Sequence, residues 1–349
     1  MTWLRWLLLA LPVSWALAAF HGPALAVFVV SGLGVIPLAA IMGEATEALA
    51  RRTGPTVGGL LNATFGNAAE LILAIVALRA GLIDLVKASL TGSILGNLLL
   101  ILGLSLVAGG VKRPSLTFNR TAAGMSGAML LLAVVGLVMP ALFAATHPAA
   151  NRATTLHLSE GVAVVLGGTY VLGLVFSLVT HRELFGARAV EHVAPDHSSR
   201  VGRAGAMLAG ATLLVAVQSE ILVHAMEQLV THLGWSEFFL GLMVIPIVGN
   251  AAEHASAVVA ARRGHTDLAL TIALGSSTQV ALFVAPLLVL AGVLVGQPMQ
   301  LVFTGFEVVA LGLASLIVTV IALDGESHWF EGAQLLAVYA ILAIAAWFV

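Results

Sequence analysis

Long apolar runs dominate the chain, and short segments with charged residues, proline or glycine separate them. A run of about 20 apolar residues is long enough to cross the hydrocarbon core of a bilayer as an α-helix. The pattern therefore predicts an all-α polytopic membrane protein with about eleven transmembrane helices. Their expected bounds are 3–20, 24–50, 57–80, 84–109, 120–143, 156–180, 204–230, 236–262, 267–295, 299–323 and 328–348.

The basic residues between these runs indicate the orientation. If the N-terminus is cytoplasmic, twelve of the 15 lysines and arginines lie on the cytoplasmic side, and only Arg79, Lys87 and Arg152 lie outside. Cytoplasmic loops of membrane proteins carry such an excess of basic residues. With eleven spans, the C-terminus is then expected outside.

A repeat lies within the apolar runs. The stretch Gly66-Asn67-Ala68-Ala69-Glu70 recurs as Gly249-Asn250-Ala251-Ala252-Glu253, about 183 positions later (253 minus 70). The match continues without a gap to Ser93 and Ser276, and about half of the 28 aligned positions (93 minus 66, plus one) are identical. Such self-similarity indicates an internal structural repeat.

The two copies lie five predicted spans apart, so they cross the membrane in opposite directions. The chain is therefore expected to contain two inverted-topology five-helix repeats and one extra helix. The expected divisions are an N-terminal helix at 1–23, a first repeat half at 24–180, a cytoplasmic linker at 181–203 and a second half at 204–349.

Composition excludes several classes of protein. The chain is 60% hydrophobic and 9% charged, and its mean hydropathy is +1.06, so it is not a soluble globule. It has no cysteine, which excludes disulfides, a thiol nucleophile and thiolate metal ligands. Its basic residues form no patch with interleaved aromatic residues, so no nucleic-acid partner is expected.

The sequence lacks the common motifs of metalloproteases, serine hydrolases and nucleotide-binding enzymes. A metalloprotease needs HExxH or HxxEH, but position 250, where HxxEH places its first histidine, is asparagine. The sequence has no GxSxG and no GxxxxGK[ST] either. No enzymatic activity and no cofactor are therefore expected.

Glu70 and Glu253 are the candidate ion ligands. An ionisable residue in a membrane span is costly and marks a functional site by default. A pair of them related by an internal repeat indicates a secondary transporter with its ion site at the repeat interface. The glycines nearby and Pro246 interrupt the helical hydrogen bonds, which frees carbonyl oxygens for an ion.

Oxygen ligands without thiolates suit a hard cation such as Ca²⁺, as transported substrate. The glutamates supply the charge. Neutral side chains that complete the site or, alternatively, only help the helices to pack are Asn67, Asn250, Ser93, Ser276, Asn97 and Gln279.

Other titratable residues leave alternatives open. Glu47 and Glu220 lie deep in their runs and are candidates for a proton pathway, or else partners of nearby arginines. His254, beside Glu253, has the same two interpretations. The histidines of the linker, His181, His192 and His197, belong to a plain connecting segment or to a pH sensor.

These residues resemble the Ca²⁺/cation–proton antiporter family of the Ca²⁺/cation antiporter superfamily. Residues 47–70, EALARRTGPTVGGLLNATFGNAAE, are similar to its first signature and residues 248–257, VGNAAEHASA, to its second. Further similar segments are 92–99, 275–279 and 324–333, so the resemblance covers nearly the whole chain. The His328 position usually holds asparagine.

The resemblance implies Ca²⁺ export in exchange for protons by alternating access, with Glu70 and Glu253 essential. It also implies eleven spans in the lipid bilayer and a homotrimer. A Na⁺/H⁺ or K⁺/H⁺ antiporter is the alternative, and a cation channel is a more distant one. The short N-terminus and the lack of an appended domain favour a prokaryotic inner membrane.

Overall fold

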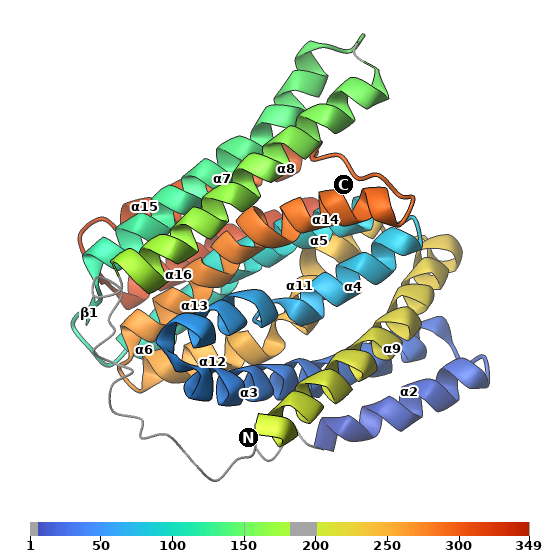
Figure 1. The fold of residues 1–349 in the computed structure, drawn as a ribbon, viewed down its shortest axis with the longest axis horizontal. Coiled ribbons are helices and arrows are strands. Elements are labelled where there is room, and N and C mark those ends of the chain that lie inside the picture. The colour runs from blue at the N-terminus through green and yellow to red at the C-terminus, as the bar shows by residue number, and fades with distance from the viewer. Residues whose placement is uncertain (1–5, 150, 182–200, 349) are drawn as a thin grey trace. The chain divides into compact units, whose positions relative to one another are not determined.

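The computed structural model describes residues 6–149, 151–181 and 201–348, and nearly all of them are helical (Figure 1). Each predicted span contains helix, and the first two are separate, because α2 (Ala10–Ala19) ends before α3 (Ala24–Phe65) begins. The strands in the described part are β1 (Leu116–Thr117) and β2 (Glu326–Ser327), which form one short antiparallel ladder. The all-α membrane fold is thus confirmed apart from this ladder.

The lengths and compositions of the helices indicate how many of them can cross a membrane. Eight described helices have the length and composition to cross a membrane, and the bent pair Glu237–Gly249 and Ala251–Arg262 makes a ninth. Two more apolar helices, Leu7–Ala19 and Gly305–Ile321, are shorter. Eleven crossings therefore remain a prediction.

The described residues form two compact units, and each takes segments from both predicted repeat halves. Unit 1 comprises residues 1–80, 171–235 and 248–252, and unit 2 comprises residues 81–170, 236–247 and 253–349. Residues 182–200, with most of the predicted linker and its His192 and His197, lie outside the described residues.

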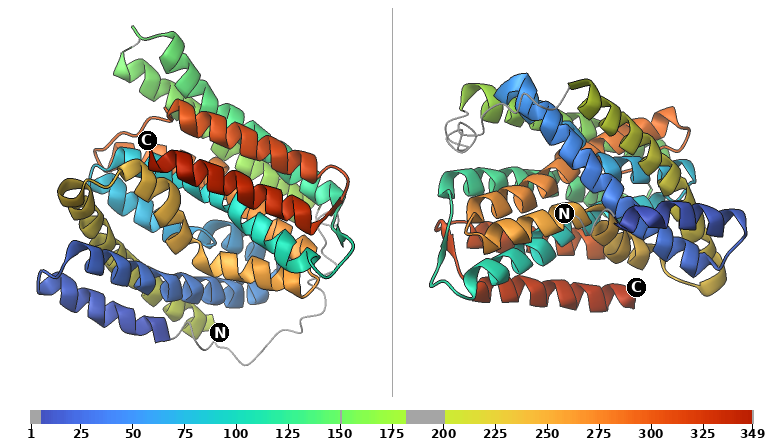
Figure 2. Two further views of the ribbon diagram at one scale, coloured as in Figure 1. Left: turned by 180° about the vertical axis from the view of Figure 1, so that it is seen from behind. Right: turned by 90° about the horizontal axis from the view of Figure 1, so that it is seen from below.

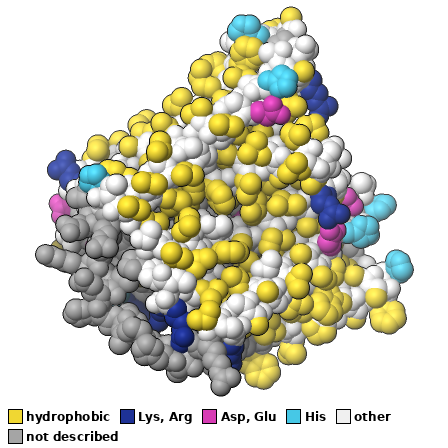
Figure 3. All heavy atoms as spheres, viewed as in Figure 1, with side chains coloured by type: hydrophobic (Ala, Val, Ile, Leu, Met, Phe, Trp, Pro, Cys, Tyr) yellow, Lys and Arg dark blue, Asp and Glu magenta, His cyan; other side chains and the backbone are white. Residues whose placement is uncertain are grey.

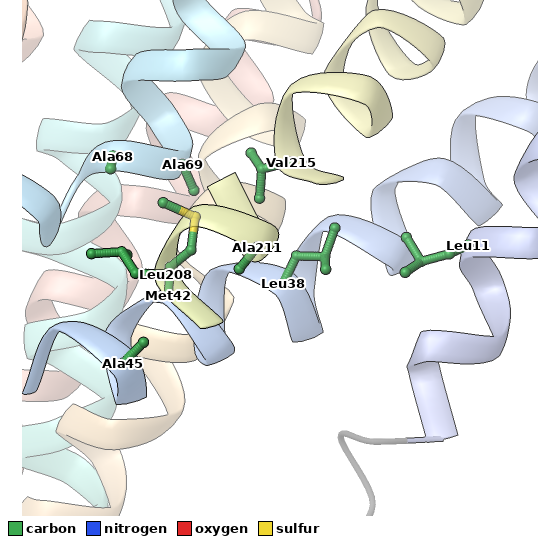
Figure 4. Close-up of a cluster of buried hydrophobic side chains, with 9 residues drawn as sticks. All are labelled: Leu11, Leu38, Met42, Ala45, Ala68, Ala69, Leu208, Ala211 and Val215. Carbon is green, nitrogen blue, oxygen red and sulfur yellow. The ribbon is translucent and has the colours of Figure 1, made fainter. Parts of the chain in front are cut away.

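Unit 1 is built around one long kinked helix. Helix α3 packs against α9 (Val201–Leu233), against α2 and against α4 (Ala68–Arg79). The kink lies at Gly54, whose φ of 85° is a conformation that residues with a Cβ atom rarely adopt. An apolar cluster from all four helices fills the contact (Figure 4), with Leu11, Leu38, Met42, Ala45, Ala68, Ala69, Leu208, Ala211 and Val215 as its buried members.

A buried polar cluster joins the N-terminal helix to the rest of unit 1. The Gln218 side chain of α9 donates to Ser14 Oγ at 2.8 Å and to the carbonyl of Ser31 at 3.1 Å. The Trp15 indole donates to Gln218 Oε1 at 3.0 Å. A polar group in such a place is costly without partners, so these bonds make α2 a fixed part of the unit although it lies outside the repeat.

Unit 2 contains the remaining helices, which Figure 2 shows from two further directions. Helix α6 packs against α16, α5 against η6, and α7 against both α15 and α13. The elements that lie in it or pass through it are α5 (Ile83–Leu95), η2 (Gly96–Ile101), α6 (Leu102–Gly110), α7 (Arg120–Thr146), α8 (Arg152–Val175), α10 (Glu237–Phe239), η6 (Leu240–Val244), α11 (Ile245–Gly249), α12 (Ala251–Arg262), α13 (Thr266–Gln279), η7 (Val280–Val284), α14 (Ala285–Leu294), α15 (Gly305–Ile321) and α16 (Trp329–Trp347).

The flank of the hairpin formed by α7 and α8 shows the surface expected in lipid. Hydrophobic side chains cover it in Figure 3, and charged side chains and histidines lie toward its tip. Val135 and Val164 are among its large exposed apolar residues. Exposed apolar surface along a long helix is typical of a segment that contacts acyl chains.

Two π-helical segments recur at matching places of the repeat. Segment η2 begins three residues after Ser93, and η7 begins four residues after Ser276. Such segments are rare and often mark functional sites in helices. Asn97 lies in the first, and Gln279 directly precedes the second.

Candidate functional site

Both copies of the repeated motif lie at a break in a helix. Helix α3 ends at Phe65, and α4 begins at Ala68, after Gly66 and Asn67. In the second copy α11 ends at Gly249 and α12 begins at Ala251. The second break bends its span by 61°. The predicted interruption of the helical hydrogen bonds is therefore confirmed at both copies.

The break gives Glu70 and Glu253 the same local setting. Each is the third residue of its helix and lies in the first turn. The first N–H groups of a helix lack intrahelical partners, and its N-terminus carries a partial positive charge that favours a carboxylate. Each break therefore places a carboxylate beside helix N–H groups that can donate to it.

Within unit 1 the second motif approaches the first. A Cβ atom added to Gly249 would lie 3.1 Å from Glu70 Cγ, so the glycine allows the backbone to come close to this side chain. Asn67 and Asn250 are both buried in the unit. Unit 1 therefore brings Glu70, Asn67 and the backbone of the second motif into one region, and their role as ion ligands remains a prediction.

Within unit 2 a hydrogen-bonded chain leads to Glu253. Ser276 donates to the Glu253 carboxylate, and Asn97 Nδ2 donates to Ser276 Oγ at 3.0 Å. Ser276 thus uses its hydroxyl as donor and acceptor at once. The chain joins residues from α12, α13 and η2, which the sequence predicted as ligands without showing how they meet.

Two buried oxygens of this chain are left without a hydrogen-bond donor. Across the ranges that the structure describes, Glu253 Oε2 and Asn97 Oδ1 have no partner. A buried acceptor without a donor is costly and calls for an explanation such as an ion. Both atoms are oxygens that a hard cation accepts as ligands.

The other two predicted ligands lie nearby in the sequence of these helices. Ser93 is buried on α5, four residues before Asn97. Gln279 is partly buried and ends α13, three residues after Ser276. Both have partners, and their role as ligands remains a prediction.

Glu47 and Glu220 contact arginines. Glu47 Oε1 lies 2.7 Å from Arg51 Nη2, and Glu220 Oε1 lies 3.7 Å from Arg79 Nη1. Both glutamate side chains are 62% exposed. This matches the alternative interpretation as arginine partners, and their part in a proton pathway remains a prediction.

His254 has a different environment from these acids. It is partly buried, and its Nε2 has no hydrogen-bond partner among the described residues. The imidazole follows Glu253 directly in α12. A buried ring nitrogen without a partner is costly, and the part of His254 in a proton pathway remains a prediction.

Two residues that sequence reasoning missed support the site. The Arg113 guanidinium donates to the carbonyls of Ala261 at 3.3 Å and Arg262 at 3.2 Å, where α12 ends. Glu307, 2% exposed, lies in the first turn of α15 and bonds to α5. The stretch Thr304-Gly305-Phe306-Glu307 has the T-x-x-E spacing of a helix capping box, so the sequence alone could have identified Glu307 as a residue that caps a helix.

Replacing Ser276 tests the hydrogen-bonded chain. Ser276→Ala removes the donor to Glu253 and the acceptor for Asn97, so we expect the cation concentration for half-maximal transport to rise about tenfold. Radioactive ion uptake into proteoliposomes measures it. Thr278→Val is the matched control, since the Thr278 hydroxyl is buried and bonds at 2.8 Å to the carbonyl of Leu274 in its own helix. Equal effects of the two substitutions would contradict the assignment.

Comparison with known proteins adds independent information. The family model described as "Sodium/calcium exchanger protein" matches residues 23–179 and 204–348. The chain is 44% identical over 98% of its length to a Ca²⁺/H⁺ antiporter of Synechocystis, of which 96% is covered. It is 45% identical to the Ca²⁺/H⁺ antiporter ChaA of Bacillus subtilis, with 95% of each chain covered.

A solved structure has the same fold. The structure of native YfkE superposes with a TM-score of 0.85 at 40% sequence identity, and 99% of this chain and 100% of that chain are covered. The family-model match leaves out residues 180–203, which include the predicted linker.

Proposed function

Because this chain belongs to the Ca²⁺/cation–proton antiporters of the sodium/calcium exchanger family, we propose that it exports Ca²⁺ from the cytoplasm in exchange for protons. The observation that best supports this proposal is the repeated helix break, which places Glu70 and Glu253 in the first turns of α4 and α12. Two acids with the same local setting, accompanied by amide and hydroxyl oxygens, suit both a divalent cation and protons.

The glutamates explain why transport in one direction requires transport in the other. A buried carboxylate that is charged and empty is penalised, so the carrier changes its access only when the acids hold Ca²⁺ or protons. Protons from outside neutralise Glu70 and Glu253, release Ca²⁺ outward and allow the carrier to return. If both acids exchange protons for Ca²⁺, about two protons per Ca²⁺ balance the charge.

The neutral ligands fit this scheme. In unit 2, Asn97 Oδ1 and Glu253 Oε2 supply oxygens that have no donor among the described residues. Ser276 connects the two side chains by hydrogen bonds. In unit 1, Asn67 and Asn250 are buried with Glu70. We assign Ser93 and Gln279 to the same set because Ser93 ends the first copy of the repeat on α5 and Gln279 follows the second copy on α13. His254 is our candidate for proton transfer at Glu253.

The test is Ca²⁺ uptake into proteoliposomes under an imposed pH gradient. Uptake that requires the gradient and collapses with a protonophore is the expected result. Proton flux driven by Na⁺ or K⁺ without Ca²⁺ uptake would instead indicate a monovalent cation antiporter. A conductance without coupling to protons would indicate a channel.

The orientation and assembly are proposed as well. The excess of basic residues supports a cytoplasmic N-terminus and an outer C-terminus in a prokaryotic inner membrane. Thiol labelling of single introduced cysteines tests this cleanly, because the chain has no cysteine. The homotrimer rests on the family resemblance, and the mass of the purified protein in detergent decides it.

A further inference from the structure

Glu307 is a buried acid that the exchange mechanism does not use. Its Oε2 accepts hydrogen bonds from Thr304 N at 2.8 Å and from Thr304 Oγ1 at 2.9 Å. The Glu307 N–H in turn donates to Thr304 Oγ1 at 3.3 Å, which completes a capping box at the start of α15. A capping box alone needs no burial and no contact with another helix.

The second carboxylate oxygen of Glu307 contacts a different helix. Thr91 Oγ1, fully buried on α5, donates to Glu307 Oε1 at 3.1 Å. Both oxygens of the acid are therefore engaged by donors. The contact joins the beginning of α15 to a point on α5 two residues before Ser93.

A second contact holds α5 one turn earlier. Lys87 Nζ donates to the carbonyl of Val302 at 3.2 Å, and its side chain is largely buried. Lys87 and Thr91 are four residues apart and share one face of the helix. That face of α5 is thus attached at two successive turns to the segment 302–307.

The other side of α5 is fixed by close packing. Gly92 lies against the backbone of Leu242 in η6, so tightly that an added Cβ atom would overlap the carbonyl oxygen. Helix α5 is therefore held between η6 and the start of α15. Any rotation of α5 about its axis breaks the bond from Thr91 to Glu307 and moves Ser93 and Asn97 with the helix.

The position of Asn97 matters because its amide bonds to Ser276, which bonds to Glu253. We propose that Glu307 is a positioning residue for the ion site: through Thr91 it fixes the rotation of α5 and so places the oxygen ligands that α5 and η2 carry. This inference rests on the proposed Ca²⁺/H⁺ exchange. It predicts an effect on ion affinity rather than on the turnover of the carrier.

The experiment measures Ca²⁺ uptake against Ca²⁺ concentration for Thr91→Val, Thr91→Ser, Glu307→Gln and the Thr91→Val/Glu307→Gln double variant. Thr278→Val is the matched control, because Thr278 is also buried and its hydroxyl bonds at 2.8 Å to the carbonyl of Leu274 in its own helix. The melting temperature in detergent is recorded for each variant.

We expect Thr91→Val and Glu307→Gln each to raise the half-saturating Ca²⁺ concentration about tenfold, the size of effect that a lost hydrogen bond to a charged group gives. The maximal rate should stay within about twofold. Thr91→Ser, which keeps the hydroxyl, should behave as the unmodified protein. The double variant should be no worse than either single variant, because both single changes remove the same hydrogen bond to a carboxylate.

Unchanged half-saturation in Glu307→Gln would overturn the proposal, and so would additive effects in the double variant. If Thr91→Val does not fold, Glu307→Gln and Thr91→Ser test the positioning role of Glu307 by the same criteria. If the unmodified protein shows no gradient-driven uptake, the result contradicts Ca²⁺/H⁺ exchange itself. The positioning role of Glu307, which rests on that exchange, is then contradicted as well.

Discussion

Glu70→Gln and Glu253→Gln should each reduce Ca²⁺ uptake driven by a pH gradient at least about hundredfold, equivalent to roughly 3 kcal/mol. Glutamine keeps the size and one oxygen ligand of the glutamate, but it carries no charge for Ca²⁺ and takes up no proton. Both halves of the exchange cycle therefore fail at once. Initial uptake rates in proteoliposomes, normalised to the amount of reconstituted protein, measure the loss.

Glu227→Gln is the matched control for these two variants. Glu227 also lies in a helix that can cross the membrane, but it is outside the repeated motif and lies 3.4 Å from His224. Uptake by this variant should stay within about twofold of the unmodified protein, since it lacks a proposed role in binding. Retained gradient-driven uptake in Glu70→Gln or Glu253→Gln would remove that residue from the mechanism.

Gly92→Ala should lower the stability of the protein by about 3 kcal/mol, at the upper end of the usual cost of overpacking. The added Cβ atom would lie on the carbonyl of Leu242 and 2.7 Å from Pro246 Cγ. Backbone atoms cannot move aside as a flexible side chain does. Helix α5 and η6 must therefore separate, and thermal unfolding in detergent should occur at a clearly lower temperature.

The repeat supplies the control for this substitution. Gly275 occupies the position equivalent to Gly92, and a Cβ atom there meets no described atom within 4 Å. Gly275→Ala should leave the unfolding temperature unchanged or raise it, because alanine favours a helix by up to about 1 kcal/mol over glycine. Similar decreases for both variants would show that the close contact at Gly92 does not limit stability.

Gly92 and Gly275 also show what the sequence predicts well. The repeat identified both glycines, the two glutamates and the interruption of the helices before them, because each of these depends on local sequence. The apolar runs likewise predicted the positions of the helices and the separation of α2 from α3. Local patterns determine such features before any tertiary contact forms.

The features that the sequence did not predict depend on partners far along the chain. Glu307 contacts Thr91 across 216 positions, and Arg113 contacts Ala261 across 148. Neither partner is visible in the neighbouring residues. For Glu47 and Glu220 the sequence left a proton pathway and arginine partners as alternatives, because depth in an apolar run does not show which way a side chain points. The structure pairs both with arginines.

The polar cluster of α2 bears on how the protein is made. Ser14 and Gln218 are 204 positions apart, so a ribosome has synthesised the whole first repeat half and the linker before the partner of the first helix exists. Ser14 can meanwhile donate to the carbonyl of Leu11 in its own turn, at 2.8 Å. Among the described residues, the Gln218 side chain bonds to Ser14, Trp15 and Ser31. We therefore expect the first helix to be in the membrane before its polar contact with α9 can form.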